Sequence, residues 1–471
     1  MSRLSSGENP PPKTKAEQEA AKEMSTLLVG IISHRKTKVA RLKKLAKIVR
    51  DQNLSKNMLG GIVGNVLEWY DFAVFGFFAP VIGFLFFPSD DPLTSLLGAF
   101  GAFAAAFLAR PLGGIFFGYI GDQFGRKSAL QLSVMLMAVP TFLIGLLPTY
   151  DQIGTLAPVL LILLRVVQGL SVGGELVGSI AFVAETAPAN QRGYFGSWTF
   201  ASCYGGMTLG ALSAVALNSI IGAEAVADWG WRLPFLAGIL IGIAGLWMRK
   251  ELTETPVFEQ MQAEGKLDEN PVRDALQLVP GTIFHASTLV VLVGGGFYLI
   301  FVWWPTFLSR YIHPHMDHIM VINTLSMILL IGLIPIMGRL SDEWGRKSLL
   351  VTSAAGMALL SWPLLTMVAA DGSLFSVIFA QLCFTVLMSA FLGPIPATLV
   401  EMFPPRLLYS SIGISYNVSL SIFGGLSPFL ATWLFKNYQS VSAPGLYLTG
   451  LSILSLLAAL GLSENSPGNK N

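Results

Sequence analysis

Residues 118–128 read GYIGDQFGRKS, and residues 338–348 read GRLSDEWGRKS. A glycine, an aspartate, a second glycine, an arginine and a lysine recur in the same order and at the same spacing. Each stretch, called a signature loop below, follows a long apolar run. The repeat therefore predicts a chain built from two comparable halves.

The composition excludes an ordinary soluble domain. Of the 471 residues, 53% are hydrophobic and 12% are charged, whereas about a quarter of the residues of a soluble domain are charged. Apolar blocks of about 20 residues recur, and at about 1.5 Å per residue each can cross the hydrocarbon layer of a bilayer. We expect an all-α membrane protein with twelve transmembrane helices at residues 58–87, 94–120, 128–148, 156–184, 195–221, 232–250, 283–308, 319–338, 347–369, 374–400, 408–435 and 445–463.

Charge is distributed unevenly along the chain. Residues 1–57 contain thirteen Lys and Arg against five Asp and Glu, and the positive-inside rule then places this tail in the cytoplasm. Twelve crossings return the C-terminus to the same side, and the basic residues Arg249 and Lys250 are assigned to an inner loop. Residues 24–49 of the tail follow a basic amphipathic pattern, which predicts a helix able to lie on an anionic leaflet.

A polar segment separates the sixth and seventh predicted helices and contains Pro256, Pro271 and Pro280. A weaker echo supports a division there, because AETAPANQRG at 184–193 and VEMFPPRLLYS at 400–410 each place a Glu, a Pro and an Arg after a fourth helix. The expected organisation is a basic tail at 1–57, a six-helix bundle at 58–250, a cytoplasmic linker at 251–282, a second six-helix bundle at 283–463 and a short tail at 464–471.

Further motifs accompany the signature loops: NVLEWYDF at 65–72, RPLGG at 110–114, RVVQG at 165–169, GGE at 173–175 and WGWRLPF at 229–235. With them the chain resembles the major facilitator superfamily of transporters and, within it, the metabolite:proton symporter family. The resemblance implies two six-helix bundles that rock about a central site. It also implies proton-coupled import of a small anionic or zwitterionic metabolite, such as a carboxylic acid or proline or betaine, across a plasma membrane, most simply a bacterial inner membrane. An exporter or exchanger of the same superfamily and a transporter-like nutrient sensor are the alternatives.

The resemblance also assigns a role to the signature loops. In the family, their charges and those after the fourth helix of each half clamp the cytoplasmic ends of the halves together. The residues to which this gate role is carried over are Gly118, Asp122, Arg126, Lys127, Glu185, Arg192, Gly338, Asp342, Arg346, Lys347, Glu401 and Arg406. For Lys127 and Lys347, a plain topology signal explains the sequence equally well.

Five charged residues fall inside predicted helices of the first half: Glu68, Asp71, Arg110, Arg165 and Glu175. A charge at membrane depth costs about 2.5–3.5 kcal/mol on insertion scales, so each one requires an explanation. We expect Glu68 or Asp71, with Glu175, to carry the coupled proton, while Arg110 and Arg165 stabilise the deprotonated form. Arg110 could equally bind a substrate carboxylate. Static salt bridges that fix the packing of helices are the alternative.

Aromatic and polar residues are candidates for the lining of a solute cavity, since aromatic faces hold ammonium groups by cation–π attraction. With Arg110, the expected substrate-binding residues are Asn65, Trp69, Tyr70, Tyr204, Tyr298, Tyr416 and Asn417. Trp303 and Trp304 lie near the outer end of their helix and are interpreted as residues of an interfacial belt.

No phosphate-binding glycine loop, metal-ligand spacing in the membrane core or nucleophile paired with a base is recognisable. We therefore predict that the chain is not an enzyme and has no metal and no cofactor, with H+ as the coupling ion. The expected partners are an organic solute, protons and the lipid bilayer, without nucleic acid, and the chain is expected to be a monomer. His313, His315 and His318 cluster in an outer loop, where histidines more often bind no metal.

Overall fold

The computed structural model describes residues 56–250, 252–308 and 318–463. The predictions for the basic tail up to residue 55 and for the tail at 464–471 lie outside the described residues. No strand occurs in the described ranges, and twelve helices are long and apolar enough to cross a membrane. These spans confirm the expected number: Lys56–Phe86, Thr94–Gln123, Arg126–Leu146, Leu156–Thr186, Ala189–Ile221, Arg232–Lys250, Pro280–Trp303, Ile319–Trp344, Arg346–Asp371, Leu374–Met402, Pro405–Tyr438 and Ser442–Leu460.

The first half comprises the helix Lys56–Phe86 and the elements up to α8. Its elements are α2 (Pro92–Gln123), α3 (Arg126–Leu146), α4 (Tyr150–Ile153), α5 (Leu156–Thr186), η1 (Ala189–Gln191), α6 (Arg192–Ile221), α7 (Ala223–Ala225), η2 (Val226–Gly230) and α8 (Arg232–Lys250). Two short helices, α9 (Pro256–Ala263) and α10 (Pro271–Leu278), follow in the connecting segment. Each of these two begins at a proline, a residue that suits the first turn of a helix because it lacks a backbone N–H.

The second half contains more interrupted helices than the first. Its elements are α11 (Pro280–Leu289), α12 (Val291–Phe297), η3 (Tyr298–Trp303), α13 (Trp304–Phe307), α14 (Ile319–Trp344), α15 (Arg346–Asp371), α16 (Leu374–Leu392), α17 (Ile395–Met402), η5 (Pro405–Leu407), α18 (Leu408–Ser419), η6 (Leu420–Gly424), α19 (Gly425–Tyr438) and α20 (Ser442–Leu460). The elements η3 and η6 are π-helical turns. Such turns are frequent at functional sites, because they locally change the direction of side chains.

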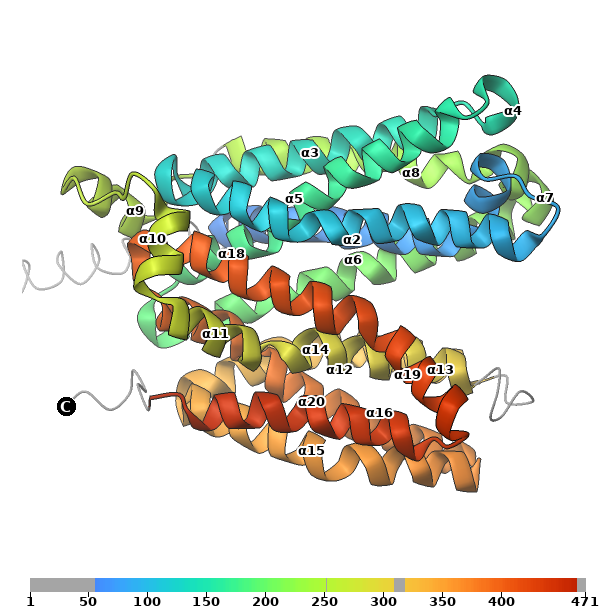
Figure 1. Cartoon of the computed structure of the whole chain (residues 1–471). Coiled ribbons are helices and arrows are strands. Elements are labelled where there is room, and N and C mark those ends of the chain that lie inside the picture. The colour runs from blue at the N-terminus through green and yellow to red at the C-terminus, as the bar shows by residue number, and fades with distance from the viewer. Residues whose placement is uncertain (1–55, 251, 309–317, 464–471) are drawn as a thin grey trace, which may run out of the picture. The chain divides into compact units, whose positions relative to one another are not determined.

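Helices pack mainly within each half. In the first half α2 packs on α5 and α3 packs on α8, while in the second half α15 packs on α20 and α14 on α16. The main contacts between the halves are those of α6 with α14 and of α2 with α18. Figure 1 shows α18 running alongside the first-half helices.

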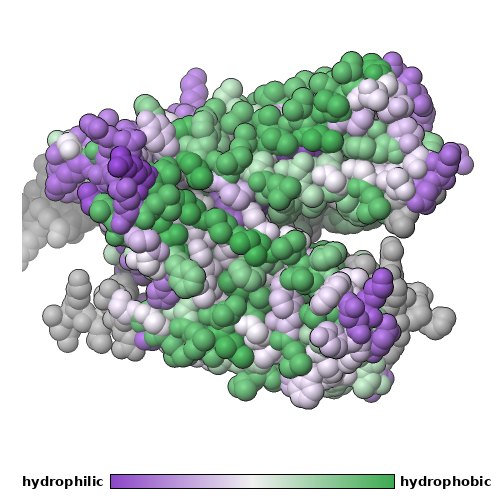
Figure 2. Space-filling view, in the orientation of Figure 1, coloured by the Kyte–Doolittle hydropathy of each residue, from purple (hydrophilic) through white to green (hydrophobic). Residues whose placement is uncertain are grey.

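The two ends of the helices differ in what they carry. The linker helices α9 and α10 lie at the end that carries the signature loops, whereas α4 and α7 lie at the opposite end (Figure 1). In Figure 2, hydrophobic residues cover the flanks of the helices and hydrophilic residues gather at the ends. Large apolar side chains such as Leu108 and Phe84 are 76% and 72% exposed, as expected for a surface covered by lipid.

Candidate functional site

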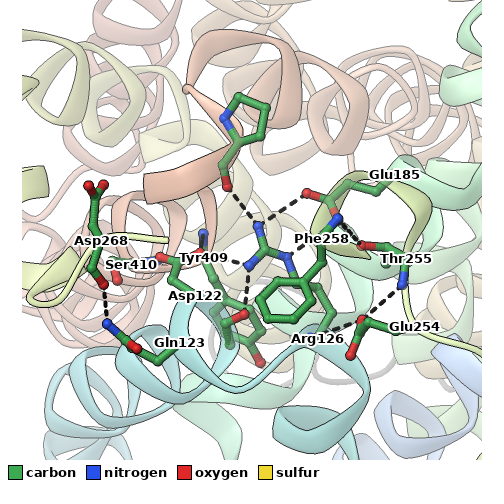
Figure 3. Close-up of polar contacts among 12 residues, drawn as sticks. Asp122, Gln123, Arg126, Glu185, Glu254, Thr255, Phe258, Asp268, Tyr409 and Ser410 are labelled. Atoms are coloured by element: carbon green, nitrogen blue, oxygen red, sulfur yellow. Dashed lines mark hydrogen bonds and ion pairs between the residues drawn. The ribbon is translucent and has the colours of Figure 1, made fainter. Parts of the chain in front are cut away.

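The first signature loop joins α2 to α3, and its aspartate contacts the other half. Asp122 accepts hydrogen bonds from the backbone N–H groups of Tyr409, at 3.1 Å, and Ser410, at 2.9 Å. Both amides lie in the first turn of α18, where N–H groups lack a partner within the helix. Arg126 binds the same carboxylate at 3.0 Å. Asp122 therefore caps a helix of the second half, as Figure 3 shows.

The second signature loop makes the reciprocal contact. Asp342 accepts hydrogen bonds from the backbone N–H groups of Gly193 and Tyr194, each at 2.8 Å, in the first turn of α6. Arg346 binds this carboxylate at 2.7 Å. Each half thus contributes one aspartate and one helix N-terminus, and a carboxylate is stabilised by the partial positive charge at such a terminus.

The repeated glycines permit these close contacts. A Cβ atom on Gly118 would lie 2.8 Å from the Cα atom of Ser410, and a Cβ atom on Gly338 would overlap the carbonyl oxygen of Gly193. The backbone of a neighbouring helix cannot move aside as a flexible side chain can. The glycines therefore allow α2 to approach α18 and α14 to approach α6.

Glutamates in the last turn of the fourth membrane-spanning helix of each half, in α5 and α17, complete both clusters. Arg126 pairs with Glu185 at 3.3 Å, and Arg346 pairs with Glu401 at 3.0 Å. These side chains are buried or nearly so, except that Glu401 keeps 23% of its side chain exposed. The structure thus brings the predicted aspartates, arginines and glutamates into two equivalent groups.

The remaining predicted gate residues differ in their placement. Arg406 lies in η5 and pairs with Asp268 at 3.3 Å, whereas Arg192 is the first residue of α6 and forms no ion pair with another described residue. The ammonium groups of Lys127 and Lys347 donate to the carbonyl oxygens of Leu252 and Leu462. Lys127 and Lys347 therefore make equivalent contacts in the two halves, whereas Arg192 and Arg406 do not.

Asp71 and Arg165 form a buried ion pair between the first helix and α5. The pair is 2.6 Å long, and both side chains are fully buried. Thr141 and Gln168 each donate a hydrogen bond of 2.9 Å to the same carboxylate. The guanidinium carbon of Arg165 lies 3.8 Å from the centre of the Phe75 ring. The carboxylate therefore has three donors from neighbouring helices.

The assignment of Arg249 to an inner loop is wrong. Arg249 is fully buried at the end of α8 and forms an ion pair with Glu175 of α5. Its Nε atom also donates to the carbonyl oxygen of Gly60 at 2.9 Å, and Ser133 donates to Glu175. The side chain turns back into the first half because its charge finds a carboxylate there, so the counter-ion of Glu175 is Arg249.

Glu68 and Arg110 are the two intramembrane charges without an ion-pair partner among the described residues. Each is 1% exposed, and both carboxylate oxygens of Glu68 and the Nε and Nη2 atoms of Arg110 lack hydrogen bonds. The two side chains nevertheless interact electrostatically. Since buried polar groups are normally paired, these atoms are candidates for contact with a solute.

Aromatic side chains from both halves surround this pair of charges. Tyr298 and Tyr416 of the second half lie near both Glu68 and Arg110. Phe107 lies 6.3 Å from Tyr298 between ring centres, and Arg110 lies 5.6 Å from the Phe107 ring. Further rings in contact here are Tyr204 with Phe297, Phe200 with Tyr416, and Trp69 with Phe72. The charges therefore lie where the halves meet.

Three predicted substrate-binding residues use polar atoms for helix packing. The Asn65 amide donates to Ser179, Ser202 and the carbonyl of Thr199. Tyr70 donates to the carbonyl oxygen of Pro234 at 2.9 Å. The Asn417 amide donates to the carbonyl of Gly173 at 2.7 Å and so joins α18 to α5.

The interpretation of Trp303 and Trp304 as an interfacial belt is also wrong. They are 7% and 3% exposed, and the indole N–H of Trp303 donates to Thr432 at 2.9 Å. Both rings pack against Phe307. The π-helical turn η3 ends at Trp303, and these tryptophans form part of a buried hydrophobic cluster with residues from both halves.

No group of three His, Cys, Asp or Glu residues suited to a metal ion occurs in the ranges that the structure describes. The predicted histidine cluster is only partly covered, because His313 and His315 lie outside the described residues.

Comparison with known proteins relates the chain to transporters. Residues 58–275 match the family model of sugar (and other) transporters, and residues 286–471 match that of the major facilitator superfamily. The glycine betaine/proline/ectoine/pipecolic acid transporter of Dickeya dadantii is 37% identical over 448 residues, which cover 92% of this chain and 88% of that protein. The proline/betaine transporter of Escherichia coli K12 is 35% identical over 449 residues, which cover 93% and 88% of the two chains.

A solved structure shows the same fold. The proton:xylose symporter XylE bound to 6-bromo-6-deoxy-D-glucose superposes with a TM-score of 0.73 at 17% identity, covering 87% of this chain and 95% of that one. The relatives are transporters rather than enzymes, and they are bacterial. With twelve apolar spans, the chain is a multi-pass protein of the inner membrane. It belongs to the major facilitator superfamily of transporters.

Proposed function

We propose that this transporter imports a small zwitterionic solute of the proline or betaine type together with protons. The observation that carries the proposal is the buried pair of Glu68 and Arg110, which has side-chain atoms without hydrogen bonds and lies near Tyr298 of the second half. A guanidinium binds a carboxylate with two parallel hydrogen bonds. A carboxylate and aromatic faces attract an ammonium group. One zwitterion would supply both partners.

The charges favour a zwitterion over a dicarboxylate. A second carboxylate on the solute would lie near Glu68, and like charges repel strongly where water is scarce. The solutes of the related transporters agree with this, because proline and glycine betaine both carry one carboxylate and one cationic nitrogen. Glu68 must be ionised while it contacts the cation, so it cannot hold the coupled proton at that stage.

Asp71 is the proton carrier in this scheme. Its carboxylate is buried against Arg165, Gln168 and Thr141. Protonation would remove the charge that holds Arg165 and so loosen the contact between the first helix and α5. Glu175 is instead held by Arg249, which supports a packing role for that pair.

The gate lies at the end that carries the signature loops, which we place at the cytoplasm because of the basic tail. Asp122 and Asp342 join the halves at this end. Rocking of the halves about the central site would separate each carboxylate from the helix that it caps. The described arrangement is therefore the one closed toward the cytoplasm.

Uptake into proteoliposomes tests the proposal. Proteoliposomes that contain the purified protein would be given an inward proton gradient. One radiolabelled solute would be added outside: proline, glycine betaine, 2-oxoglutarate, citrate, succinate or shikimate. We expect accumulation of proline or glycine betaine. Asp71→Asn should lose gradient-driven accumulation while it still exchanges labelled for unlabelled solute, and Arg110→Met should lose both activities.

Other outcomes select other functions. Accumulation of a dicarboxylate would overturn the zwitterion assignment. Exchange by the unmodified protein without any response to the gradient would indicate an exchanger. Thermal stabilisation by a solute without flux would indicate a sensor.

A further inference from the structure

The hydroxyl group of Thr141 has one hydrogen atom and two acceptors within reach. Thr141 lies in α3 and is fully buried. Its Oγ1 atom lies 2.9 Å from Oδ1 of Asp71 and 2.8 Å from the carbonyl oxygen of Met137. A hydroxyl group donates only one hydrogen bond at a time. The hydrogen atom can therefore point to the carboxylate or to the backbone while the heavier atoms stay in place.

The neighbouring Gln168 determines which of these groups donate. Its Oε1 atom accepts a hydrogen bond of 2.6 Å from Nη1 of Arg165, and an arginine can only donate. The amide nitrogen of Gln168 therefore faces the other way, where it donates to Asp71 at 2.9 Å and to Thr141 at 2.8 Å. One lone pair of the Thr141 hydroxyl oxygen thus accepts from Gln168, and the second lone pair has no donor among the described residues.

An ionised Asp71 and a protonated Asp71 need different partners. Arg165, Gln168 and Thr141 all donate to the ionised carboxylate, which only accepts. A protonated carboxyl group carries an O–H that needs an acceptor. Arg165 cannot accept, and Gln168 already uses its oxygen for Arg165. The hydroxyl oxygen of Thr141 is the remaining acceptor among the described hydrogen-bond partners of this carboxyl group.

From this geometry we propose that Thr141 is a positioning residue for the coupled proton. While Asp71 is ionised, the Thr141 hydroxyl donates to it. When Asp71 takes up a proton from the outer side, the hydroxyl turns its hydrogen atom to the Met137 carbonyl and accepts the new O–H. The inference rests on the proposed role of Asp71 as the proton carrier. It names the residue that allows this buried carboxyl group to gain and lose a proton without an unpaired donor.

The turn of this hydroxyl also changes which helices Asp71 joins. The ionised carboxylate is held to α5 by Arg165 and Gln168. After protonation, the O–H of Asp71 points to Thr141 in α3, while Arg165 keeps its contact with Gln168 on its own helix. Proton uptake would thus weaken the contact of the first helix with α5 and preserve its contact with α3.

Few other charges surround the carboxyl group. Arg165 is the charged group that faces Asp71 from α5, and Glu68 and Tyr70 are the titratable groups near it on its own helix. The side chain that contacts it from α3 is the uncharged Thr141. Removal of the Thr141 hydroxyl therefore changes no charge, and it affects the proton site through hydrogen bonds alone.

Infrared difference spectroscopy of the full chain in lipid, recorded between acidic and alkaline pH, tests the inference. The variant Asp71→Asn identifies the C=O stretching band of the protonated Asp71 carboxyl group by its loss. In Thr141→Val the ionised carboxylate keeps two donors, whereas the O–H of the protonated form has no acceptor. We expect the band to move to higher frequency and to appear at roughly tenfold higher proton concentration, the factor that corresponds to one hydrogen bond of ordinary strength.

Three further variants separate the hydroxyl group from the volume of the side chain. Thr141→Ser keeps the hydroxyl and should restore the frequency and the pH dependence of the band. Thr141→Ala also removes the hydroxyl and should act as Thr141→Val does, so it replaces the valine variant if that one does not fold. Thr385→Val in α16 is the matched control and should leave the band unchanged. Thr385 is fully buried and donates to the carbonyl oxygen of Gln381 at 2.7 Å, and it hydrogen-bonds to no carboxylate in the described part of the chain.

Transport by proteoliposomes supplies a second readout. The quantity measured is the ratio of gradient-driven accumulation of radiolabelled glycine betaine to exchange of labelled for unlabelled glycine betaine. For Thr141→Val we expect this ratio to fall, and to recover when the outer proton concentration is raised about tenfold. A residue that only packs helices together would change accumulation and exchange in parallel.

An Asp71 band with the same frequency and pH dependence in Thr141→Val as in the unmodified protein would overturn the inference. A band that appears at lower proton concentration would also overturn it, because the hydroxyl would then serve only the ionised form. Parallel loss of accumulation and exchange would assign a packing role to Thr141 instead. If Asp71→Asn loses neither the band nor accumulation, Asp71 is not the proton carrier and both proposals fail. Failure of this inference alone is therefore distinguishable from failure of the proposed function.

Discussion

At the scale of single residues, the intramembrane charges differ in whether the protein itself supplies their partners. Asp71 and Glu175 each have an arginine within the first half, whereas Glu68 and Arg110 have buried atoms that no described residue hydrogen-bonds. The sequence locates these charges but not their pairing, because pairing depends on the direction in which a long side chain points. Arg249 stands at the end of an apolar run, as a topology signal would, yet its side chain turns inward.

Removal of either partner of the Glu175–Arg249 pair should destabilise the protein. Arg249→Met and Glu175→Gln should each lower the free energy of unfolding by about 3–5 kcal/mol, because each leaves a buried polar group unpaired. The loss of unfolding free energy in the double variant should be smaller than the sum of the losses in the two single variants. Thermal unfolding of the purified protein would measure this. If Glu175→Gln unfolds normally but loses proton-driven uptake, Glu175 is a proton carrier and not a packing residue.

At the scale of helices, the sequence predicts the spans well and their interruptions poorly. Hydropathy locates all twelve spans, because length and apolar character suffice for that. It does not show the π-helical turns η3, which begins at Tyr298, and η6, which begins four residues after Tyr416, although Pro305 and Pro428 follow these turns in the sequence. The contacts of α6 with α14 and of α2 with α18 are likewise invisible in one sequence. Only the repeated glycines indicate close approach.

Enlarging these glycines should separate the helices that they join. Gly118→Ala should disfavour the contact of α2 with α18, and Gly338→Ala that of α14 with α6, each by about 1–3 kcal/mol, a typical cost of overpacking. Faster hydrogen exchange in the first turns of α18 and α6 would report the change. Gly101→Ala in α2 and Gly332→Ala in α14 are matched controls, since a Cβ atom there meets no neighbour within 4 Å. Equal effects in all four variants would refute a specific role for the repeat.

At the scale of the whole molecule, the two aspartate contacts hold the same end of the two halves together. They share no residue, so their contributions to the closed arrangement should add. The sequence indicates the charges that take part, but it does not show that each aspartate binds backbone amides of the opposite half. The pattern of side chains does not indicate which backbone N–H groups donate to a carboxylate.

Asp122→Asn and Asp342→Asn should each shift the protein toward separation at the signature loops. Hydrogen bonds to a charged group contribute about 1.5–3 kcal/mol, so the double variant should shift further than either single one. Distances between spin labels at the exposed positions Phe124 and Trp344 would measure the separation. Glu343→Gln is the control, because the ion-pair partner of Glu343 among the described residues is Arg339 of its own helix. An unchanged distance in the double variant would contradict the role of both aspartates.

The reciprocity of these contacts has a consequence for symmetry. Each half presents an aspartate and a helix start that match the helix start and the aspartate of the other, which is the isologous pattern of a two-fold homodimer. A single six-helix half of this design would therefore be complementary to a second copy of itself. Duplication and fusion of such a half would preserve these two contacts between the copies. Sequence differences between the copies could then accumulate in the central site while the contacts remain.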